Sequence, residues 1–214
     1  MHYLLDFDDT LVLGPNTWAF QEVLPDLIRS NDLPYDKALF DEVTLKAQQQ
    51  ANEDVSEDEL LDSLFETLNW PDKLKSELIH RIYNGYQVHL FEDTLPFLDK
   101  LRKQGDKLYL VTNNDYAPQL VESLGIADYF AAIITPKLSG VAAKPRRDMW
   151  DVLQTEHSLQ GDIVMIGDDP WSDGSFAQKI GIPCWILDRL SRYSSLYDEL
   201  PYQWAQSFED IVFS

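Results

Sequence analysis

Acidic side chains gather within the first eleven residues of the chain. Asp6-Phe7-Asp8-Asp9-Thr10 follows directly on the apolar run His2-Tyr3-Leu4-Leu5. Three carboxylates so close together repel one another unless a proton or a cation joins them. A hard divalent cation such as Mg2+ takes oxygen ligands and fits this need. One carboxylate can then act as a nucleophile while a second exchanges protons.

This cluster does not identify a site by itself. The chain has 37 Asp and Glu among 214 residues, so an Asp-x-Asp pattern arises readily by chance. In isolation such a cluster is typical of a solvated turn. The interpretation therefore depends on polar residues at the ends of other predicted strands.

Three further polar sites occur at or just after predicted strands. They contain Thr112-Asn113, Lys144, and Asp168 with Asp173. The Thr112 hydroxyl and the amide of Asn113 can donate hydrogen bonds to phosphoryl oxygens. Lys144 can neutralise those oxygens and shield the nucleophile from them. Asp168 can complete an octahedral Mg2+ site, with Asp173 behind it.

The first cluster supplies the remaining roles of a phosphoryl transfer. Asp6 can be the nucleophile and form an aspartyl phosphate. Asp8 can protonate the leaving oxygen and then deprotonate the water that hydrolyses the intermediate. In order along the chain, these sites together predict phosphoryl-transfer chemistry, although each of them alone is weak.

The elements that must position these residues alternate between strands and helices after residue 91. Alternation of this kind predicts βαβ units and an α/β fold with a parallel sheet, in which the carboxyl ends of the strands meet at one edge. Asp115 is expected to cap the helix that follows it. The predicted strands are 2–5, 107–112, 132–135, 162–166 and 183–187, and the predicted helices are 94–104, 117–124, 148–157 and 174–180.

Residues 15–90 form a predicted helical insertion between the first strand and the rest of the sheet. Apolar residues recur there at helical spacing, beginning with Phe20, Val23 and Leu24. Pro25 is expected to kink or split the first helix, and Ser56 to Glu59 fits a capping box. We therefore expect an α/β core domain made of 1–14 and 91–214, and a helical cap domain at 15–90.

Composition narrows the classes of partner. A net charge of −20 and a pI near 4.3 argue against binding of nucleic acid polymers or anionic lipid through bulk electrostatics. No apolar run approaches a membrane span. A cleaved leader is not expected, because it would remove Asp6. Cys184 lies in a predicted strand and is interpreted as a core residue. We expect a cytoplasmic protein that is a monomer or a weak homodimer and acts on a small phosphorylated substrate.

The chain resembles the haloacid dehalogenase-like hydrolase superfamily. Asp6-x-Asp8-x-Thr10 is similar to its first motif, Val111-Thr112-Asn113 to its second, Lys144-Pro145 to its third, and Gly167-Asp168-x-x-x-x-Asp173 to its fourth. The resemblance spans about residues 2 to 187. It implies a Rossmann-like sheet of order 5-4-1-2-3 and a C1-type helical cap. It also implies Mg2+ bound by the carboxylates of Asp6 and Asp168 and the backbone carbonyl of Asp8.

Position 8 separates the reactions of that superfamily. Its dehalogenases lack the second aspartate and need no metal, so Asp8 favours hydrolysis of a phosphate ester. A phosphomutase of the β-phosphoglucomutase kind uses the same residues and remains an alternative. A non-catalytic phospho-accepting or binding protein is a third. The identity of the substrate and the cap residues that select it are not readable from the sequence.

Overall fold

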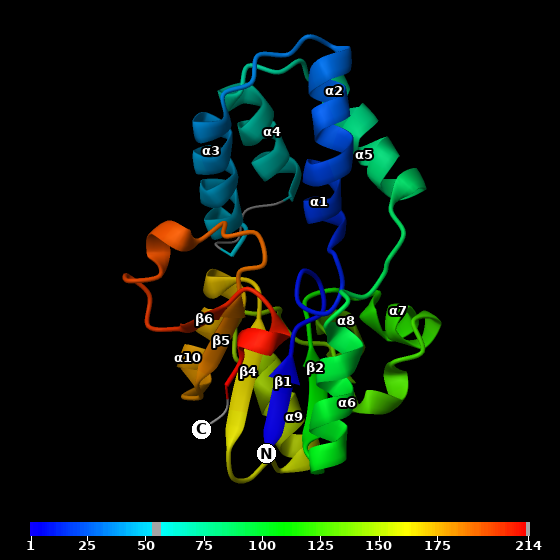
Figure 1. Cartoon of the computed structure of the whole chain (residues 1–214), viewed down its shortest axis with the longest axis vertical. Coiled ribbons are helices and arrows are strands. Elements are labelled where there is room, and N and C mark those ends of the chain that lie inside the picture. The colour runs from blue at the N-terminus through cyan, green and yellow to red at the C-terminus, as the bar shows by residue number, and fades with distance from the viewer. Residues whose placement is uncertain (53–56, 213–214) are drawn as a thin grey trace. The chain divides into compact units, whose positions relative to one another are not determined.

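The structure, a computed structural model, describes residues 1–52 and 57–212 (Figure 1). Two compact units make up the chain. The first consists of Met1–Leu13 and Val88–Ser214, and the second of Gly14–Gln87. In the part of the chain that is described, no helix has both the length and the apolar character to cross a membrane.

A six-stranded parallel sheet forms the centre of the first unit. Its order is β3-β2-β1-β4-β5-β6, which confirms the predicted order 5-4-1-2-3 and adds a sixth strand beside β5. The strand β6 was not predicted from the sequence. The strands are β1 (His2–Leu5), β2 (Lys107–Val111), β3 (Phe130–Ile134), β4 (Ile163–Gly167), β5 (Cys184–Leu187) and β6 (Gln203–Ala205).

Side chains along each strand point alternately to the two faces of the sheet, and apolar residues on both sides bury both faces. Tyr3 and Leu5 pack in one apolar cluster with Phe97 and Leu101 from a neighbouring helix. Leu4, between them, is fully buried but lies outside that cluster, because successive strand residues point to opposite faces. Burial on both faces is typical of parallel sheets. Cys184 is buried, as predicted for a core residue.

The helices of this unit connect the strands. Two of them, α6 and α9, have the predicted bounds, and Gly105 ends α6 at φ +80, the left-handed conformation that glycine adopts freely. Figure 1 shows α6 in front of the sheet and α9 behind it. The helices are α6 (Thr94–Gln104), α7 (Ala117–Ser123), α8 (Pro136–Ser139), α9 (Asp148–His157) and α10 (Ser175–Ile180), with the short turns η2 (Ala127–Tyr129), η3 (Pro170–Gly174), η4 (Ser194–Leu196) and η5 (Phe208–Asp210).

The second unit is helical throughout its regular elements. Its helices pack around an apolar cluster that includes Leu27, Phe65 and Trp70. The indole of Trp70 also donates a hydrogen bond to the Pro34 carbonyl at 2.8 Å, so its polar edge is satisfied. The elements are α1 (Pro15–Trp18), η1 (Ala19–Val23), α2 (Leu24–Ser30), α3 (Lys37–Gln50), α4 (Glu57–Thr67) and α5 (Lys73–Gly85). That this unit serves as a cap stays a prediction.

Three local expectations had different outcomes. The helix is not split at Pro25: the π-helical turn η1 runs directly into α2, which has Pro25 in its first turn. Asp115 does not cap α7. Its carboxylate instead accepts a hydrogen bond from the backbone amide of Lys137 at 2.8 Å, in the first turn of α8. The predicted capping box begins at Ser56, outside the described residues.

Candidate active site

A buried lysine joins two of the predicted aspartates. Lys144 Nζ lies 2.7 Å from Asp6 Oδ1 and 2.5 Å from Asp173 Oδ1, and all three residues are buried. Burial opposes the ammonium charge, but Asp173 and Asp6 outweigh it and raise the pKa of Lys144. The first strand, the loop after β3 and the turn after β4 therefore meet at one ion-paired cluster.

Three carboxylates of this cluster are close enough to share a cation. One oxygen each from Asp6, Asp168 and Asp173 lie within 4.8 Å of one another. Burial raises the pKa of Asp168 well above its usual value, so the ionised cluster needs positive charge nearby. An all-oxygen set of this kind fits Mg2+.

Asp173 is tied to the protein through both of its oxygens. Besides the contact with Lys144, its Oδ2 accepts a hydrogen bond from the Asp169 amide at 3.1 Å. Asp173 thus connects the lysine loop with the turn after β4; its predicted place behind the metal ligands stays a prediction.

Asp8 lies in a different environment from Asp6. Its Oδ2 accepts a hydrogen bond at 2.8 Å from Nδ2 of Asn114, a residue that follows the end of β2. Burial and then the charge of Asp6 raise the pKa of Asp8 to about 7. A carboxyl group of such pKa can both give and take a proton near neutral pH.

The β2 strand end positions the lysine loop. Asn113 Oδ1 accepts a hydrogen bond from the backbone N–H of Lys144 at 2.8 Å, and Asn113 Nδ2 donates one to the Lys144 carbonyl at 3.0 Å. Thr112 is buried next to it, and its hydroxyl accepts a hydrogen bond from the Asn114 amide at 3.2 Å. The Asn113 side chain is thus used by the loop, while the group predicted to contact phosphate is the backbone amide of Asn113.

The comparisons with known proteins agree with this arrangement. A haloacid dehalogenase-like hydrolase family model matches residues 1–181 of the 214. The chain belongs to the haloacid dehalogenase-like hydrolase family. No curated protein matches it in sequence.

Solved structures of this family share the fold across almost the whole chain. YfnB of Bacillus subtilis, solved with bound magnesium, superposes with a TM-score of 0.69 at 19% identity, covering 98% of this chain and 95% of YfnB. A HAD phosphatase of Thermococcus onnurineus superposes with a TM-score of 0.59 at 21% identity, covering 98% of this chain and 94% of the phosphatase. A 2-haloacid dehalogenase of Pseudomonas syringae pv. tomato DC3000 superposes with a TM-score of 0.56 at 20% identity, covering 97% of this chain and 94% of the dehalogenase.

Two side chains of this haloacid dehalogenase-like hydrolase contact aspartates of the predicted site without having been predicted from the sequence. Asn114 bonds Asp8, and Arg192 Nη2 lies 2.8 Å from Asp168 Oδ2. Asn114 stands two residues after Thr112, so its place at a strand end was a usable signal. Arg192 lies in the C-terminal segment, where no pattern distinguishes it from an exposed arginine.

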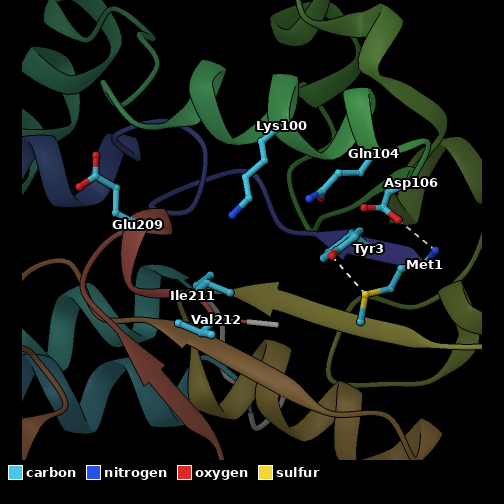
Figure 2. A pocket seen from close by; sticks show the side chains of 8 residues that line it. All are labelled: Met1, Tyr3, Lys100, Gln104, Asp106, Glu209, Ile211 and Val212. Atoms are coloured by element: carbon cyan, nitrogen blue, oxygen red, sulfur yellow. Dashed lines mark hydrogen bonds and ion pairs between the residues drawn. The ribbon is translucent and has the colours of Figure 1, made fainter. Parts of the chain in front are cut away.

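One hollow of the first unit lies away from these residues. It measures about 590 Å³ and surrounds Tyr3, Lys100 and Asp106, near the amino end of β1 (Figure 2). The amino group of Met1 pairs with Asp106 there at 3.0 Å. None of the predicted site residues lines this hollow.

Proposed function

We propose that this hydrolase is a Mg2+-dependent phosphatase that cleaves a small phosphorylated metabolite through an aspartyl-phosphate intermediate. The observation that carries the proposal is the difference between the two aspartates of the first motif. Asp6 is held by the ammonium group of Lys144, while Asp8 is held by the neutral amide of Asn114. Asp6 therefore has a cation beside it, while burial and the charge of Asp6 raise the pKa of Asp8 to about 7.

In the first step Asp6 attacks phosphorus. Lys144 binds Oδ1 of Asp6, and the other carboxylate oxygen forms the new O–P bond. The bond between phosphorus and the ester oxygen breaks, and protonated Asp8 gives its proton to that leaving oxygen. Lys144, the Thr112 hydroxyl and the Asn113 amide stabilise charge on the remaining phosphoryl oxygens.

In the second step water hydrolyses the aspartyl phosphate. Asp8, now ionised, takes a proton from the attacking water, and the O–P bond to Asp6 breaks. Phosphate is released and Asp6 is regenerated as a carboxylate. The group that gave the first proton therefore takes the second, which requires one residue with a pKa near the working pH.

Asp6, Asp168 and the Asp8 carbonyl would hold the metal. Bound Mg2+ would lower the repulsion between the carboxylate nucleophile and the phosphate dianion. The buried carboxylate oxygens of Asp6 and Asp168 support this assignment, since such a donor set matches a hard cation. YfnB, which has the same fold, was solved with magnesium.

The test is phosphate release from a panel of phosphorylated metabolites and an aryl phosphate. We expect repeated turnover with Mg2+, loss of turnover in EDTA, and at least a thousandfold loss in Asp6→Asn, on the order of what removal of a nucleophile costs. Asp198→Asn, an exposed acid of the same unit, is the charge-matched control. Folded wild-type protein that binds Mg2+ but releases no phosphate from any compound would contradict the proposal.

The phosphomutase alternative uses the same residues, and its reaction products distinguish it from a phosphatase. A mutase moves phosphate between two positions of one sugar phosphate and leaves little free phosphate. A non-catalytic phospho-acceptor would stop after a single equivalent. Product analysis in the same assay therefore distinguishes all three.

A further inference from the structure

An arginine from the C-terminal segment contacts the carboxylate cluster. Arg192 Nη2 lies 2.8 Å from Asp168 Oδ2, and Arg192 Nη1 lies 3.5 Å from Asp9 Oδ2. The two side chains in the closer pair are 25% and 10% exposed, so water screens their contact only in part. Lys144 pairs with Asp6 and Asp173, so the two cations contact different carboxylates of the cluster.

The backbone at Arg192 has hydrogen bonds of its own, separate from the contacts of the guanidinium group. The buried carboxylate of Asp188 accepts hydrogen bonds from the Arg192 amide at 2.7 Å, the Tyr193 amide at 2.8 Å and the Tyr197 hydroxyl at 3.0 Å. The ring of Tyr193 packs edge-on against Trp171, with centroids 5.6 Å apart. These contacts therefore hold the segment in place in addition to the ion pairs of the Arg192 guanidinium group.

A permanent positive charge at this place has a consequence for metal binding. A guanidinium group stays protonated at every pH that a protein tolerates. It offsets the negative charge of Asp168 and repels any cation bound to the same carboxylate. It also occupies one oxygen of Asp168, so a metal has to share that carboxylate with it.

We propose that Arg192 is a resident counter-ion of the carboxylate cluster that weakens binding of the divalent cation. It stabilises Asp168 and Asp9 while the metal is away and limits affinity when the metal is present. This inference rests on the metal site of the proposed function. It makes Arg192 a positioning residue that acts through Asp168.

Titration of the full-length protein with Mg2+ alone, followed by calorimetry, tests the proposal. Arg192→Gln and Arg192→Met both remove the charge, and Met keeps much of the packing of the side-chain stem. We expect both to bind Mg2+ about tenfold more tightly than wild type, and Arg192→Lys to stay within about threefold, because a unit charge beside a divalent ion is a strong repulsion at short range.

Arg189→Gln is the matched control, because it removes one arginine charge from the same segment. Arg189 pairs with Asp93 at 3.1 Å and does not contact Asp168, so we expect its Mg2+ affinity to stay within about twofold of wild type. Thermal unfolding adds a second readout. Without metal, Arg192→Gln should unfold at a lower temperature than wild type. Saturating Mg2+ should raise the Tm of this variant by more than it raises the Tm of wild type.

The direction of the change separates this role from a merely structural one. If Arg192 only shaped the segment, its loss would leave Mg2+ affinity unchanged or weaker, and that result would overturn the inference while the phosphatase activity of the wild type stood. If neither wild type nor variant bound Mg2+, the inference and the metal-dependent function would fail together. Tighter binding in Arg192→Gln and Arg192→Met alone supports the proposal.

Discussion

Asn114 is the residue that most directly controls the orientation of the proposed acid–base group. Its Nδ2 donates to Asp8 Oδ2 at 2.8 Å, while its Oδ1 accepts from the Tyr116 amide at 2.8 Å, which fixes the direction of the side-chain amide. The carboxylate is thereby aimed from one side by a group that does not itself react. Loss of this contact should affect proton transfer more than substrate binding.

We expect Asn114→Ala to lower kcat about tenfold, a part of the total contribution of general acid–base catalysis, with KM changed less than about twofold. Steady-state kinetics on the best substrate of the panel measure both constants. Asn84→Ala serves as the control, since its amide bonds within its own helix, to the His80 carbonyl at 2.7 Å. An unchanged kcat in Asn114→Ala would show that Asp8 is positioned without it.

His2 gives the start of β1 a dependence on pH that is independent of catalysis. Burial, followed by the charges of the N-terminal amino group and Lys107, lowers the pKa of His2 below its usual value of 6.5. The folded state therefore favours neutral His2, and the unfolded state binds more protons as the pH falls through 6.5. Stability from this residue is present above that pH and is lost below it.

We expect His2→Gln to lose less stability than wild type between about pH 7 and about pH 5.5, because the variant has no group to protonate there. Urea unfolding at several pH values measures the difference. His80 is an exposed histidine of the other unit. If His80→Gln reduced the loss of stability at low pH as much as His2→Gln does, the assignment to His2 would be contradicted.

At the scale of elements, the last residue of β4 shows how closely strand and site are packed. A Cβ atom on Gly167 would lie 2.1 Å from Asp173 Oδ2 and 2.2 Å from Asp173 Cγ. Both distances are far below van der Waals contact. A side chain at this position therefore has to displace Asp173, which pairs with Lys144.

We expect Gly167→Ala to abolish most activity and to destabilise the fold by about 1–3 kcal/mol, the usual range for overpacking. Activity and urea unfolding are measured on the same preparation. Gly140→Ala is the control, because Gly140 has φ +66 but no atom within 4 Å of the added Cβ; it should lose some stability through backbone strain and keep its activity. Full activity in Gly167→Ala would mean that the site does not need Asp173 where it lies.

The elements also show what the sequence can and cannot predict. Asp6 and Asp168 were predictable, because short apolar runs locate the ends of β1 and β4. The contact between Lys144 and Asp6 was predictable only from the order of motifs, since Lys144 lies in a loop that is clamped by Asn113 from another strand. The strand β6 was not predicted, because three residues, Gln203–Ala205, give no apolar run. The position of Arg192 beside Asp168 results from tertiary packing alone, so no sequence pattern indicated it.

At the scale of the whole molecule, the net charge of −20 opposes the approach of an anionic substrate. No lysine or arginine occurs between Ala47 and Asp72, so a long stretch of the second unit adds only negative charge. The cations proposed to stabilise the phosphate, by contrast, act at contact distance within a buried site, where salt screens poorly. Added salt should therefore remove more repulsion than attraction.

We expect kcat/KM for a phosphorylated substrate to rise about two- to threefold as KCl increases from about 10 mM to about 150 mM, since the Debye length falls from roughly 30 Å to roughly 8 Å over that range. The rates are measured with Mg2+ held saturating, so that weaker metal binding at higher salt does not enter. Because screening acts on the encounter, kcat at saturating substrate should stay constant. A fall of kcat/KM with salt would instead mean that local positive charge at the entrance outweighs the field of the whole chain, and that substrate is drawn in despite the charge of −20.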